Sequence, residues 1–353
     1  MDHLCALCGS RGPLISGTLG LCAGCIRNRP DQALPVAQSV HARVRCRLGQ
    51  PPAPPQTESG AHCSLCERNC RIGEGERGYC GLRTKRDSRL IHLAGIPPRG
   101  ILHWYRDPLP TNCVADWVCV GSKQFGRHNL AVFYGSCTLN CLFCQNWHYR
   151  ELTAGHTRGI SARELSDAAV EETFCVCFFG GDPASQMLHA LAAARLLARD
   201  GVVVCWETAG TSHPRLLDYA FELSLETGGC VKFDLKSHSE SLHIALTGGS
   251  NQRTLENFAR AARRFEERPH PPPVVASTLL VPGYVDAAEV ARIARFITDQ
   301  NPEIPYSLLG FAPQFMMTDL PRTSLRHAEE AVEAARAGGL KNVHVGNRHL
   351  LAR

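Results

Sequence analysis

The chain has 353 residues, of which 44% are hydrophobic, and a formal net charge of +5. This length and composition suit one large α/β domain with small appendages and a fully buried core. The charge is too small and too dispersed to argue for nucleic-acid binding, which stays open as an alternative. We expect no membrane association, because no apolar run has the length that spans a bilayer.

The unusual feature of the composition is its 18 cysteines. Secreted disulfide-rich proteins are short and carry a signal peptide. This long chain instead starts Met-Asp-His-Leu-Cys, with no apolar segment behind a basic start. We therefore expect a cytoplasmic protein whose clustered thiols bind metals. Four cysteines stand singly in apolar, strand-like runs, where we expect inert core residues: Cys175, Cys177, Cys205 and Cys230.

The first cysteine group consists of two Cys-x2-Cys pairs near the N-terminus: Cys5, Cys8, Cys22 and Cys25. Four thiolates on two short hairpins make a closed tetrahedral site, which suits structural Zn²⁺ better than iron. A segment of this size is too small to fold on a hydrophobic core alone. Residues 1–48 are therefore expected to form a zinc-ribbon-like module.

A proline-rich, polar stretch follows, and we interpret residues 49–60 as a linker. Residues 61–127 then form a cysteine-rich segment with a complete second quartet: Cys63, Cys66, Cys70 and Cys80. Four close thiolates in a glycine-rich frame suit either structural zinc or an auxiliary iron–sulfur cluster. We interpret Cys113 and Cys119, in the same segment, as spare core or loop residues.

From residue 128 to the end, short β-rich runs alternate with amphipathic helical patterns. The predicted strands are 130–134, 175–179, 202–206, 231–235, 274–281, 306–311 and 343–345. Asp286 is placed to cap a helix whose apolar face contains Val290, Ile293 and Ile297. Such alternation means right-handed crossovers and a parallel sheet. The expected fold class is α/β: a partial (β/α)6 barrel over residues 128–353, with N-terminal cysteine-rich metal-binding modules.

Three cysteines follow the first predicted strand of the barrel: Cys137, Cys141 and Cys144. Three thiolates at this spacing can hold three irons of a [4Fe–4S] cluster and leave the fourth iron to an outside ligand. In radical chemistry that ligand is S-adenosylmethionine (SAM). On spacing alone, the alternative is a zinc loop that takes its fourth ligand from elsewhere.

The next three strands end in glycine or charged residues. The strings are Gly180-Gly181-Asp182, Glu207-Thr-Ala-Gly210 and Asp234-Leu-Lys236. Ligand-binding groups gather at the carboxyl ends of parallel strands. Each string by itself could be a turn or a solvated surface group. Together with the cysteine loop, they favour a ligand site at one rim of the barrel.

The chain resembles radical SAM enzymes of the pyruvate formate-lyase activating enzyme type, and more closely the radical enzyme of the AmmeMemoRadiSam system. The resemblance covers residues 61–353 and rests on an ordered series of motifs: the cysteine loop running into Trp147, Gly180–Pro183, Glu207–Gly210, Asp234–Lys236, Thr247–Asn251, Leu280–Gly283, Pro305–Phe311 and Val343–Asn347. It implies a radical SAM oxidoreductase that reductively cleaves SAM to a 5′-deoxyadenosyl radical for hydrogen-atom abstraction.

The resemblance also implies roles for single residues. Cys137, Cys141 and Cys144 would ligate the cluster, and Phe143 would pack beside the adenine. The remaining cofactor-binding residues fall into three groups: Gly180, Gly181 and Asp182 for the methionine amino group, Asp234 and Lys236 for its carboxylate, and Glu207 in a region that helps activating enzymes hold a monovalent cation. Relatives often have Asp where Glu207 stands, so a cation site is in doubt.

The resemblance leaves the substrate open. One hypothesis is an activase of a glycyl-radical enzyme; another is modification of a small molecule, peptide or RNA. Either activity would need an electron donor of the flavodoxin or ferredoxin type. An alternative of a different class is a non-catalytic metal-binding scaffold that uses its cysteine clusters to dock a partner.

Overall fold

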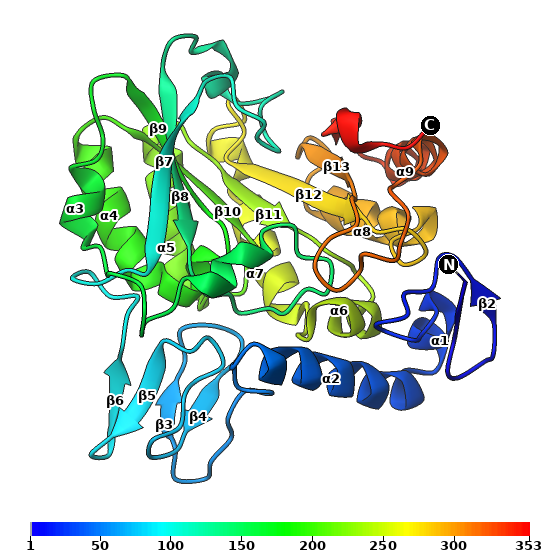
Figure 1. Cartoon of the computed structure of the whole chain (residues 1–353). Helices are drawn as coiled ribbons and strands as arrows, with labels where there is room; N and C mark the ends of the chain where they lie inside the picture. Colours follow the sequence, from blue (N-terminus) through cyan, green and yellow to red (C-terminus); the bar gives the residue numbers. More distant parts are fainter. Residues whose placement is uncertain (1) are drawn as a thin grey trace.

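The computed structural model describes residues 2–353, and an open eight-stranded sheet forms its centre (Figure 1). The strand order is β14-β13-β12-β11-β10-β9-β8-β7. The strands are β7 (Leu102–Pro108), β8 (His128–Tyr134), β9 (Thr173–Phe179), β10 (Val203–Thr208), β11 (Val231–Asp234), β12 (Val274–Leu280), β13 (Tyr306–Gly310) and β14 (Val343–Gly346). All neighbours from β8 to β14 are parallel, and only β7 pairs antiparallel, with β8.

The expected fold class is confirmed: seven predicted strands form the parallel part of the sheet, in chain order. Within residues 2–353, β14 does not pair with β7, so the barrel is partial. Strand β7 was not predicted. Its sequence, Leu-His-Trp-Tyr-Arg-Asp-Pro, is mostly exposed and lacks the apolar run of a buried strand. It forms the edge of the sheet, where polar residues and proline are tolerated.

Helices cover the outer face of the sheet (Figure 1). They are α3 (Ala162–Ser166), α4 (Met187–Arg199), α5 (Pro214–Thr227), α6 (Glu240–Thr247), α7 (Gln252–Ala262), α8 (Ala287–Gln300) and α9 (Leu325–Ala337). Short 3-10 turns lie at Val120–Lys123, Trp147–Glu151, Pro183–Gln186, Phe265–Glu267 and Arg348–Leu350. Helix α8 begins as predicted, since the Asp286 carboxylate accepts a hydrogen bond of 2.9 Å from the backbone N–H of Glu289.

The core lies between the sheet and these helices. Phe178 and Trp206, on neighbouring strands β9 and β10, stack with their ring centroids 4.6 Å apart, and both are fully buried. Large aromatic side chains of this kind dominate the free energy of core burial. Their packing fixes β9 and β10 relative to each other, and therefore the loops that follow both strands.

The N-terminal module packs against the barrel. It contains β1 (His3–Leu4), β2 (Arg11–Gly12), α1 (Ala23–Asn28) and the long α2 (Pro30–Arg47), which runs along α6 (Figure 1). The buried Tyr284 hydroxyl donates to the Leu21 carbonyl at 2.9 Å and accepts from the Ser16 N–H at 3.0 Å. The barrel and the module therefore share one continuous apolar core.

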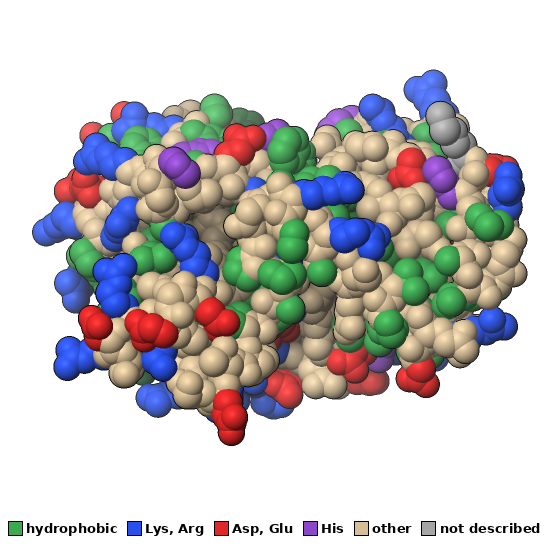
Figure 2. All heavy atoms as spheres, turned by 60° about the horizontal axis from the view of Figure 1, so that its bottom comes forward, with side chains coloured by type: hydrophobic (Ala, Val, Ile, Leu, Met, Phe, Trp, Pro, Cys, Tyr) green, Lys and Arg blue, Asp and Glu red, His purple; other side chains and the backbone are tan. Residues whose placement is uncertain are grey.

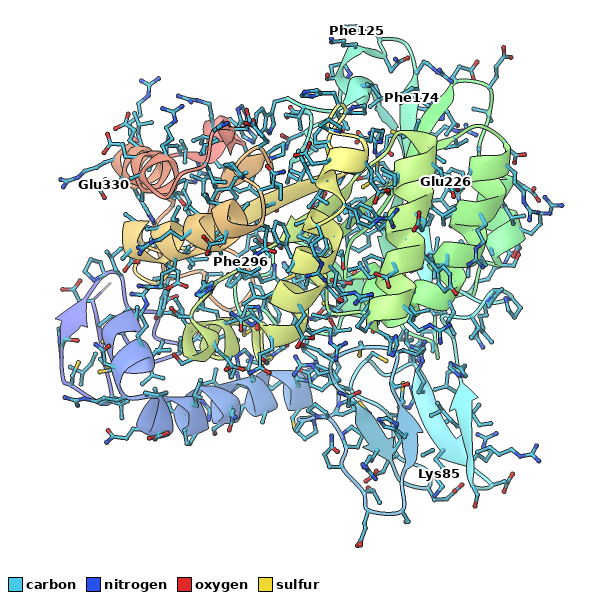
Figure 3. All side chains as sticks on the ribbon, turned by 180° about the vertical axis from the view of Figure 1, so that it is seen from behind. Lys85, Phe125, Phe174, Glu226, Phe296 and Glu330 are labelled. Carbon is cyan, nitrogen blue, oxygen red and sulfur yellow. The ribbon has the colours of Figure 1, made fainter. Side chains whose placement is uncertain are left out.

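The cysteine-rich segment contributes two small antiparallel hairpins. They are β3 (Ala61–Cys63) with β4 (Cys70–Ile72), and β5 (Arg83–Arg86) with β6 (Arg89–His92). Both lie below the barrel in Figure 1, and Lys85 marks the β5–β6 hairpin at the bottom of Figure 3. The boundaries at residues 48, 60 and 127 stay predictions about domain organisation.

The surface that carries the hairpins and α2 comes forward in Figure 2, where basic and acidic side chains are intermixed. Among the described helices, none combines the length and the apolar character needed to cross a bilayer.

Candidate functional site

One cavity lies at the carboxyl ends of β8, β9, β10 and β11. It is lined by all three cysteines of the loop after β8 and by every residue expected to bind the cofactor: Cys137, Cys141, Cys144, Phe143, Gly180, Gly181, Asp182, Glu207, Asp234 and Lys236. These residues come from four separate strand ends, and the parallel sheet brings them to one rim. Their individual roles stay predictions.

The Gly180-Gly181 turn packs directly against the cysteine loop. Both glycines have left-handed backbone angles, with φ of 67° and 49°. A Cβ on Gly181 would lie 2.2 Å from the Ser136 carbonyl oxygen, and one on Gly180 would lie 2.3 Å from the Phe133 ring. The backbone N–H of Asp182 donates to the same Ser136 carbonyl at 3.1 Å. Glycine is therefore required here for close approach between the turn and the loop that carries the cysteines.

The Asp182 carboxylate is buried and holds the ends of β9 and β10 together. It accepts hydrogen bonds from the backbone N–H groups of Ala184 at 2.6 Å and Ala209 at 2.7 Å, and from the Thr208 hydroxyl at 3.0 Å. Burial raises the pKa of Asp182, while these donors favour its charged form. Because both oxygens already have partners within the chain, Asp182 acts here as a structural acceptor that shapes the cavity wall.

Lys236 forms a partly buried ion pair with Asp234 at the end of β11. Its ammonium group also lies 5.7 Å from the centroid of the Phe143 ring. Burial alone would lower the pKa of Lys236, but the Asp234 carboxylate raises it above the usual range. A full positive charge is therefore maintained beside the cysteine loop, where it could meet a carboxylate ligand.

The loop that follows Lys236 is anchored by Glu289, a buried carboxylate from α8. Glu289 Oε1 accepts from the backbone N–H groups of His238 at 2.8 Å and Ser239 at 2.7 Å, and Oε2 accepts from Arg292 at 2.6 Å. Burial opposes ionisation, but these donors outweigh it and lower the pKa of Glu289 to about 2. The carboxylate thus stays ionised and keeps the loop in place.

The cysteine loop itself is held from three directions through Asn140. The backbone N–H of Asn140 donates to the Thr247 carbonyl at 2.7 Å, and its side-chain oxygen accepts from Arg150 at 2.8 Å. Its side-chain nitrogen lies 2.9 Å from Nδ1 of His41, on α2. Nε2 of His41 lies 3.0 Å from the Ala245 carbonyl, so the ring donates there and accepts from Asn140. The role of His41 was not predicted, because no local pattern in the sequence links it to a loop 99 residues away.

The three thiols of the loop are suited to metal binding. Burial raises the pKa of Cys137 and of Cys141 to about 12 and that of Cys144 to about 11. Thiols whose pKa is raised in this way become thiolates at neutral pH when metal ions share their charge. The backbone N–H of Leu139 already donates to Cys137 Sγ at 3.3 Å, the kind of contact that supports metal-bound sulfur.

Residues 131–297, which contain this cavity, match the Radical SAM superfamily. Over these residues, the expected radical SAM domain is confirmed. A [4Fe–4S] cluster and SAM are the cofactors that such a domain uses. The strands that position the cavity, β8 to β11, all lie within or overlap the matched residues.

Several curated proteins are similar to the chain around this radical SAM domain. An uncharacterized protein of Methanocaldococcus jannaschii is 22% identical over 311 residues, which is 82% of each chain. The isethionate sulfite-lyase activating enzyme of Oleidesulfovibrio alaskensis is 34% identical over 139 residues, or 37% of this chain and 41% of the relative. The pyruvate formate-lyase 1-activating enzyme of Escherichia coli is 27% identical over 191 residues, which is 50% of this chain and 74% of the relative.

Among solved structures, a domain of pyruvate-formate lyase-activating enzyme from Bacteroides vulgatus aligns with a TM-score of 0.40 and 18% identity. The alignment covers 49% of this chain and 99% of that domain.

A second, larger cavity of about 580 Å³ adjoins the first, and its walls come from residues 105–129 and 344–349 as well as from the matched region. The two cavities share Gln145, Asn146, Phe179, Glu207 and Leu309 in their walls. Six cysteines also line the second cavity: Cys113, Cys119, Cys175, Cys177, Cys205 and Cys230. The sequence placed these cysteines in the core or in loops, but it gave no sign that they share one chamber.

Lys232 is the one fully buried lysine at the wall of this second cavity within residues 2–353. Its ammonium group lies 3.1 Å from the sulfur atoms of Cys113 and Cys177, and 3.5 Å from Glu207 Oε2. Glu207, expected near a monovalent cation, is therefore paired with a lysine. The burial of Lys232 was not predicted, because a lysine within a strand is usually expected on the surface.

The open side of the partial barrel is covered by the segment before β8. The Trp117 ring stacks on His344 of β14, with centroids 5.0 Å apart, and its Nε1 donates to Ser307 Oγ of β13 at 2.9 Å. Ser307 in turn donates to the Val114 carbonyl at 2.6 Å. This segment thereby connects the β7 side of the sheet to β13 and β14.

The first cysteine quartet converges as a closed metal site would. The sulfur atoms of Cys5, Cys8, Cys22 and Cys25 all lie within 4.8 Å of one another, and those of Cys8 and Cys22 are 3.8 Å apart. The backbone N–H of Cys22 points at Cys5 Sγ at 3.4 Å. Tetrahedral zinc with Zn–S bonds of about 2.3 Å places its sulfur ligands about 4 Å apart. The second quartet lines a separate small cavity beneath the cysteine loop.

Proposed function

We propose that the chain is a radical SAM enzyme that reductively cleaves SAM and uses the resulting 5′-deoxyadenosyl radical to abstract a hydrogen atom. One observation carries this proposal: the three-cysteine loop and all seven expected cofactor-binding residues line one cavity. When bound, the cluster supplies an electron to the sulfonium of SAM. The chain's own residues hold the cofactors, orient them and keep water away from them.

In this proposal, Cys137, Cys141 and Cys144 ligate three irons. The charged Lys236 orients the SAM carboxylate, and its partner Asp234 keeps the ammonium in place. Phe143 offers an aromatic face to the adenine. The Gly180-Gly181 turn presents backbone groups to the amino group of the methionine.

We propose the second cavity as the substrate chamber. It shares a wall with the first cavity at Glu207, so a radical formed in one has direct access to the other. The buried Lys232 and the half-buried Glu207 place charges of both signs in the chamber wall, which suits a polar substrate. The volume of about 580 Å³ accommodates a small molecule or a single side chain of a peptide.

A second candidate is an activase that forms a radical on a partner protein. The names of the similar activating enzymes of O. alaskensis and E. coli favour it. An activase must admit a peptide loop of its partner to the same chamber. A flavodoxin or ferredoxin type of donor would supply the electron in either case.

We also propose that the Cys5 quartet binds Zn²⁺, on the basis of its converging sulfur atoms.

The test is anaerobic reconstitution of the full chain with iron and sulfide, followed by dithionite and SAM. Production of 5′-deoxyadenosine above that of a Cys137→Ala variant supports the proposal. A non-catalytic scaffold predicts equal, background yields from both proteins, and that result would overturn the proposal. Cys46→Ala is a matched control, because Cys46 is exposed on α2 and lies outside both cavities.

Small-molecule modification and activase function can be separated with SAM cleavage as the readout. We expect SAM cleavage to accelerate when a true substrate occupies the chamber. A metabolite fraction below 1 kDa that increases 5′-deoxyadenosine formation favours the first candidate. An increase that is confined to the protein fraction and abolished by protease favours the activase.

A further inference from the structure

The second cysteine quartet surrounds a small cavity between the hairpins and the cysteine loop. Cys63 and Cys70 face each other as paired residues of β3 and β4, while Cys66 lies in the turn between them. Cys80 completes the set after the next turn. The same cavity is lined by Thr138, the residue that directly follows Cys137. The quartet therefore lies immediately behind the loop that carries the radical cluster ligands.

The spacing of sulfur atoms distinguishes this quartet from the first one. The sulfur atoms of the Cys5 quartet lie within 4.8 Å of one another, as one small ion requires. In residues 2–353 that group alone has this spacing, and no three sulfur atoms of the Cys63 quartet approach so closely. The same is true of Cys137, Cys141 and Cys144. Wider spacing suits a [4Fe–4S] core, whose irons and sulfides lie between the thiolates.

Two arginines lie at the wall of the cavity and give it a positive surrounding. Arg68 and Arg83 both line it, and Arg83 is 2% exposed. Within the described chain, Nε and Nη2 of Arg83 and Nη2 of Arg68 are buried without a hydrogen-bond partner. Buried donors are rarely left unpaired. Of these atoms, Arg68 Nη2 lies beside Gly249 and Arg83 Nη2 beside Gly95, outside the cavity lining. The contact with the quartet is made by Arg83 Nη1, which would donate to a cluster thiolate as outer-shell donors commonly do in metal sites.

The charges around the quartet also favour an anionic occupant. Arg83 Nη1 lies 3.6 Å from Cys80 Sγ, and Arg68 has one acidic neighbour, Glu67, at 3.5 Å. Two buried guanidinium groups facing one carboxylate leave a positive excess, and a buried charge is costly without an opposite charge nearby. A [4Fe–4S]²⁺ core with four thiolates has a net charge of about −2. Zinc with four thiolates would have the same charge, so the spacing of the sulfur atoms decides between the two.

Direct hydrogen bonds join the quartet to the cysteine loop. The Ser136 hydroxyl donates to the Cys80 carbonyl at 2.8 Å, and Arg68 Nε donates to the Thr138 carbonyl at 2.6 Å. Ser136 and Thr138 flank Cys137, and neighbouring Cα atoms are about 3.8 Å apart. A cofactor in contact with Thr138 is therefore close enough to one at Cys137 for rapid electron transfer.

We propose that Cys63, Cys66, Cys70 and Cys80 bind a second [4Fe–4S] cluster that relays single electrons to the cluster at Cys137, Cys141 and Cys144. The relay rests on the proposed function, whereas the ligand assignment does not. A one-electron donor of the flavodoxin or ferredoxin type reduces the second cluster from 2+ to 1+. The electron passes to the first cluster and then to the SAM sulfonium. The S–C5′ bond breaks into methionine and the 5′-deoxyadenosyl radical, and the second cluster returns to 2+.

The ligand assignment is tested by counting metals in the full chain after anaerobic reconstitution. A Cys137→Ala/Cys141→Ala/Cys144→Ala variant should retain about four irons and four sulfides, and a Cys63→Ala/Cys70→Ala variant should lose about four of each relative to the wild type. Cys46→Ala should match the wild type. Zinc bound at the Cys5 quartet, measured in every sample, reports that the variants remain folded. A triple variant that contains zinc but no iron beyond background would overturn the assignment.

The relay is tested by electron paramagnetic resonance of the dithionite-reduced wild type. Two reduced clusters this close should couple magnetically, so the wild-type spectrum should be broader and relax faster than the sum of the two variants' spectra. A wild-type spectrum equal to that sum would overturn the relay. The iron count of the triple variant does not depend on SAM cleavage. Four irons there, with no 5′-deoxyadenosine from the wild type, would reject the proposed function and leave the ligand assignment standing.

Discussion

His41 of α2 and Asn140 of the cysteine loop are joined by a buried hydrogen bond of 2.9 Å across 99 residues of sequence. The N-terminal module therefore takes part in positioning the loop that carries Cys137, Cys141 and Cys144. Its long helix is a support for the radical SAM domain as well as a connection to the hairpins.

The first prediction concerns the pH dependence of this contact. Burial lowers the pKa of His41 to about 4, below the value of 6.5 for an exposed histidine. The unfolded chain therefore takes up this proton at a higher pH than the folded chain does. The stability contribution is complete above pH 6.5 and is lost as the pH falls toward 4, with a slope of up to about 1.4 kcal/mol per pH unit.

Urea unfolding of wild type and His41→Gln at pH 7.5, 6 and 5 measures this slope. The variant should be less stable at pH 7.5, and the difference between the two proteins should shrink as the pH falls. His189 and His243, also buried with a pKa of about 4, contribute equally to both proteins. A constant difference across the three pH values would contradict the prediction.

The second prediction concerns Gly181. In Gly181→Ala the new methyl group would lie 2.2 Å from the Ser136 carbonyl, at a φ of 49°. The turn and the cysteine loop must separate, so we expect loss of most of the iron at Cys137 and at least a tenfold loss of 5′-deoxyadenosine formation. Gly201→Ala is the control, because its φ of 78° is equally unfavourable but no atom lies within 4 Å of the new Cβ.

Gly201→Ala should cost about 1 kcal/mol of stability and leave the iron content unchanged. An equal loss of iron in the two variants would show that backbone strain, rather than contact with the cysteine loop, determines the effect. Full iron content in Gly181→Ala would contradict the prediction.

The third prediction separates Lys232, which is buried within β11, from Lys236, which is partly buried just after this strand. Lys236→Met removes the charge beside Phe143 and Cys141, so we expect SAM to bind at least tenfold more weakly. Lys232→Met removes the partner of Glu207 in the second cavity, and should leave SAM affinity within about threefold of the wild type. Isothermal titration with SAM on reconstituted protein measures both. A larger loss of SAM affinity in Lys232→Met than in Lys236→Met would indicate that SAM binds in the second cavity.

The fourth prediction concerns the Cys5 quartet. Cys25→Ser should release about one zinc per chain and loosen the contact of Tyr284 with Leu21 and Ser16. The same module contains α2, whose His41 contacts the cysteine loop. We therefore also expect a lower thermal midpoint for the whole chain. Zinc analysis and differential scanning calorimetry check both effects. Unchanged zinc content would show that another ligand set binds the metal.

Local patterns were sufficient to predict much of this architecture. The seven parallel strands were predicted from apolar runs, and the N-cap of α8 from Asp286 ahead of its apolar face. The motifs at the ends of four strands predicted one shared ligand site, because parallel topology brings the carboxyl ends of strands together. These features depend on short stretches of chain and on one general rule of sheet packing.

Features that depend on distant partners were not predicted. Strand β7 has no apolar run, and its pairing with β8 appears only once the sheet exists. Lys232 looks like a surface residue until three strands and a loop enclose it. The contact of His41 with the cysteine loop likewise requires α2 to pack on α6. In each case, no spacing in the sequence encodes the neighbour.

The stacking of Trp117 on His344 has a consequence for what can enter the enzyme. These two rings and the hydrogen bond to Ser307 hold the segment around Trp117 against β13 and β14, on the open side of the partial barrel. Stacked rings of this kind contribute only about 1 kcal/mol beyond their buried area. Breaking these contacts would open the chamber to a larger substrate without breaking any strand pairing. The size limit of the substrate therefore depends on movement of the one segment that carries Trp117.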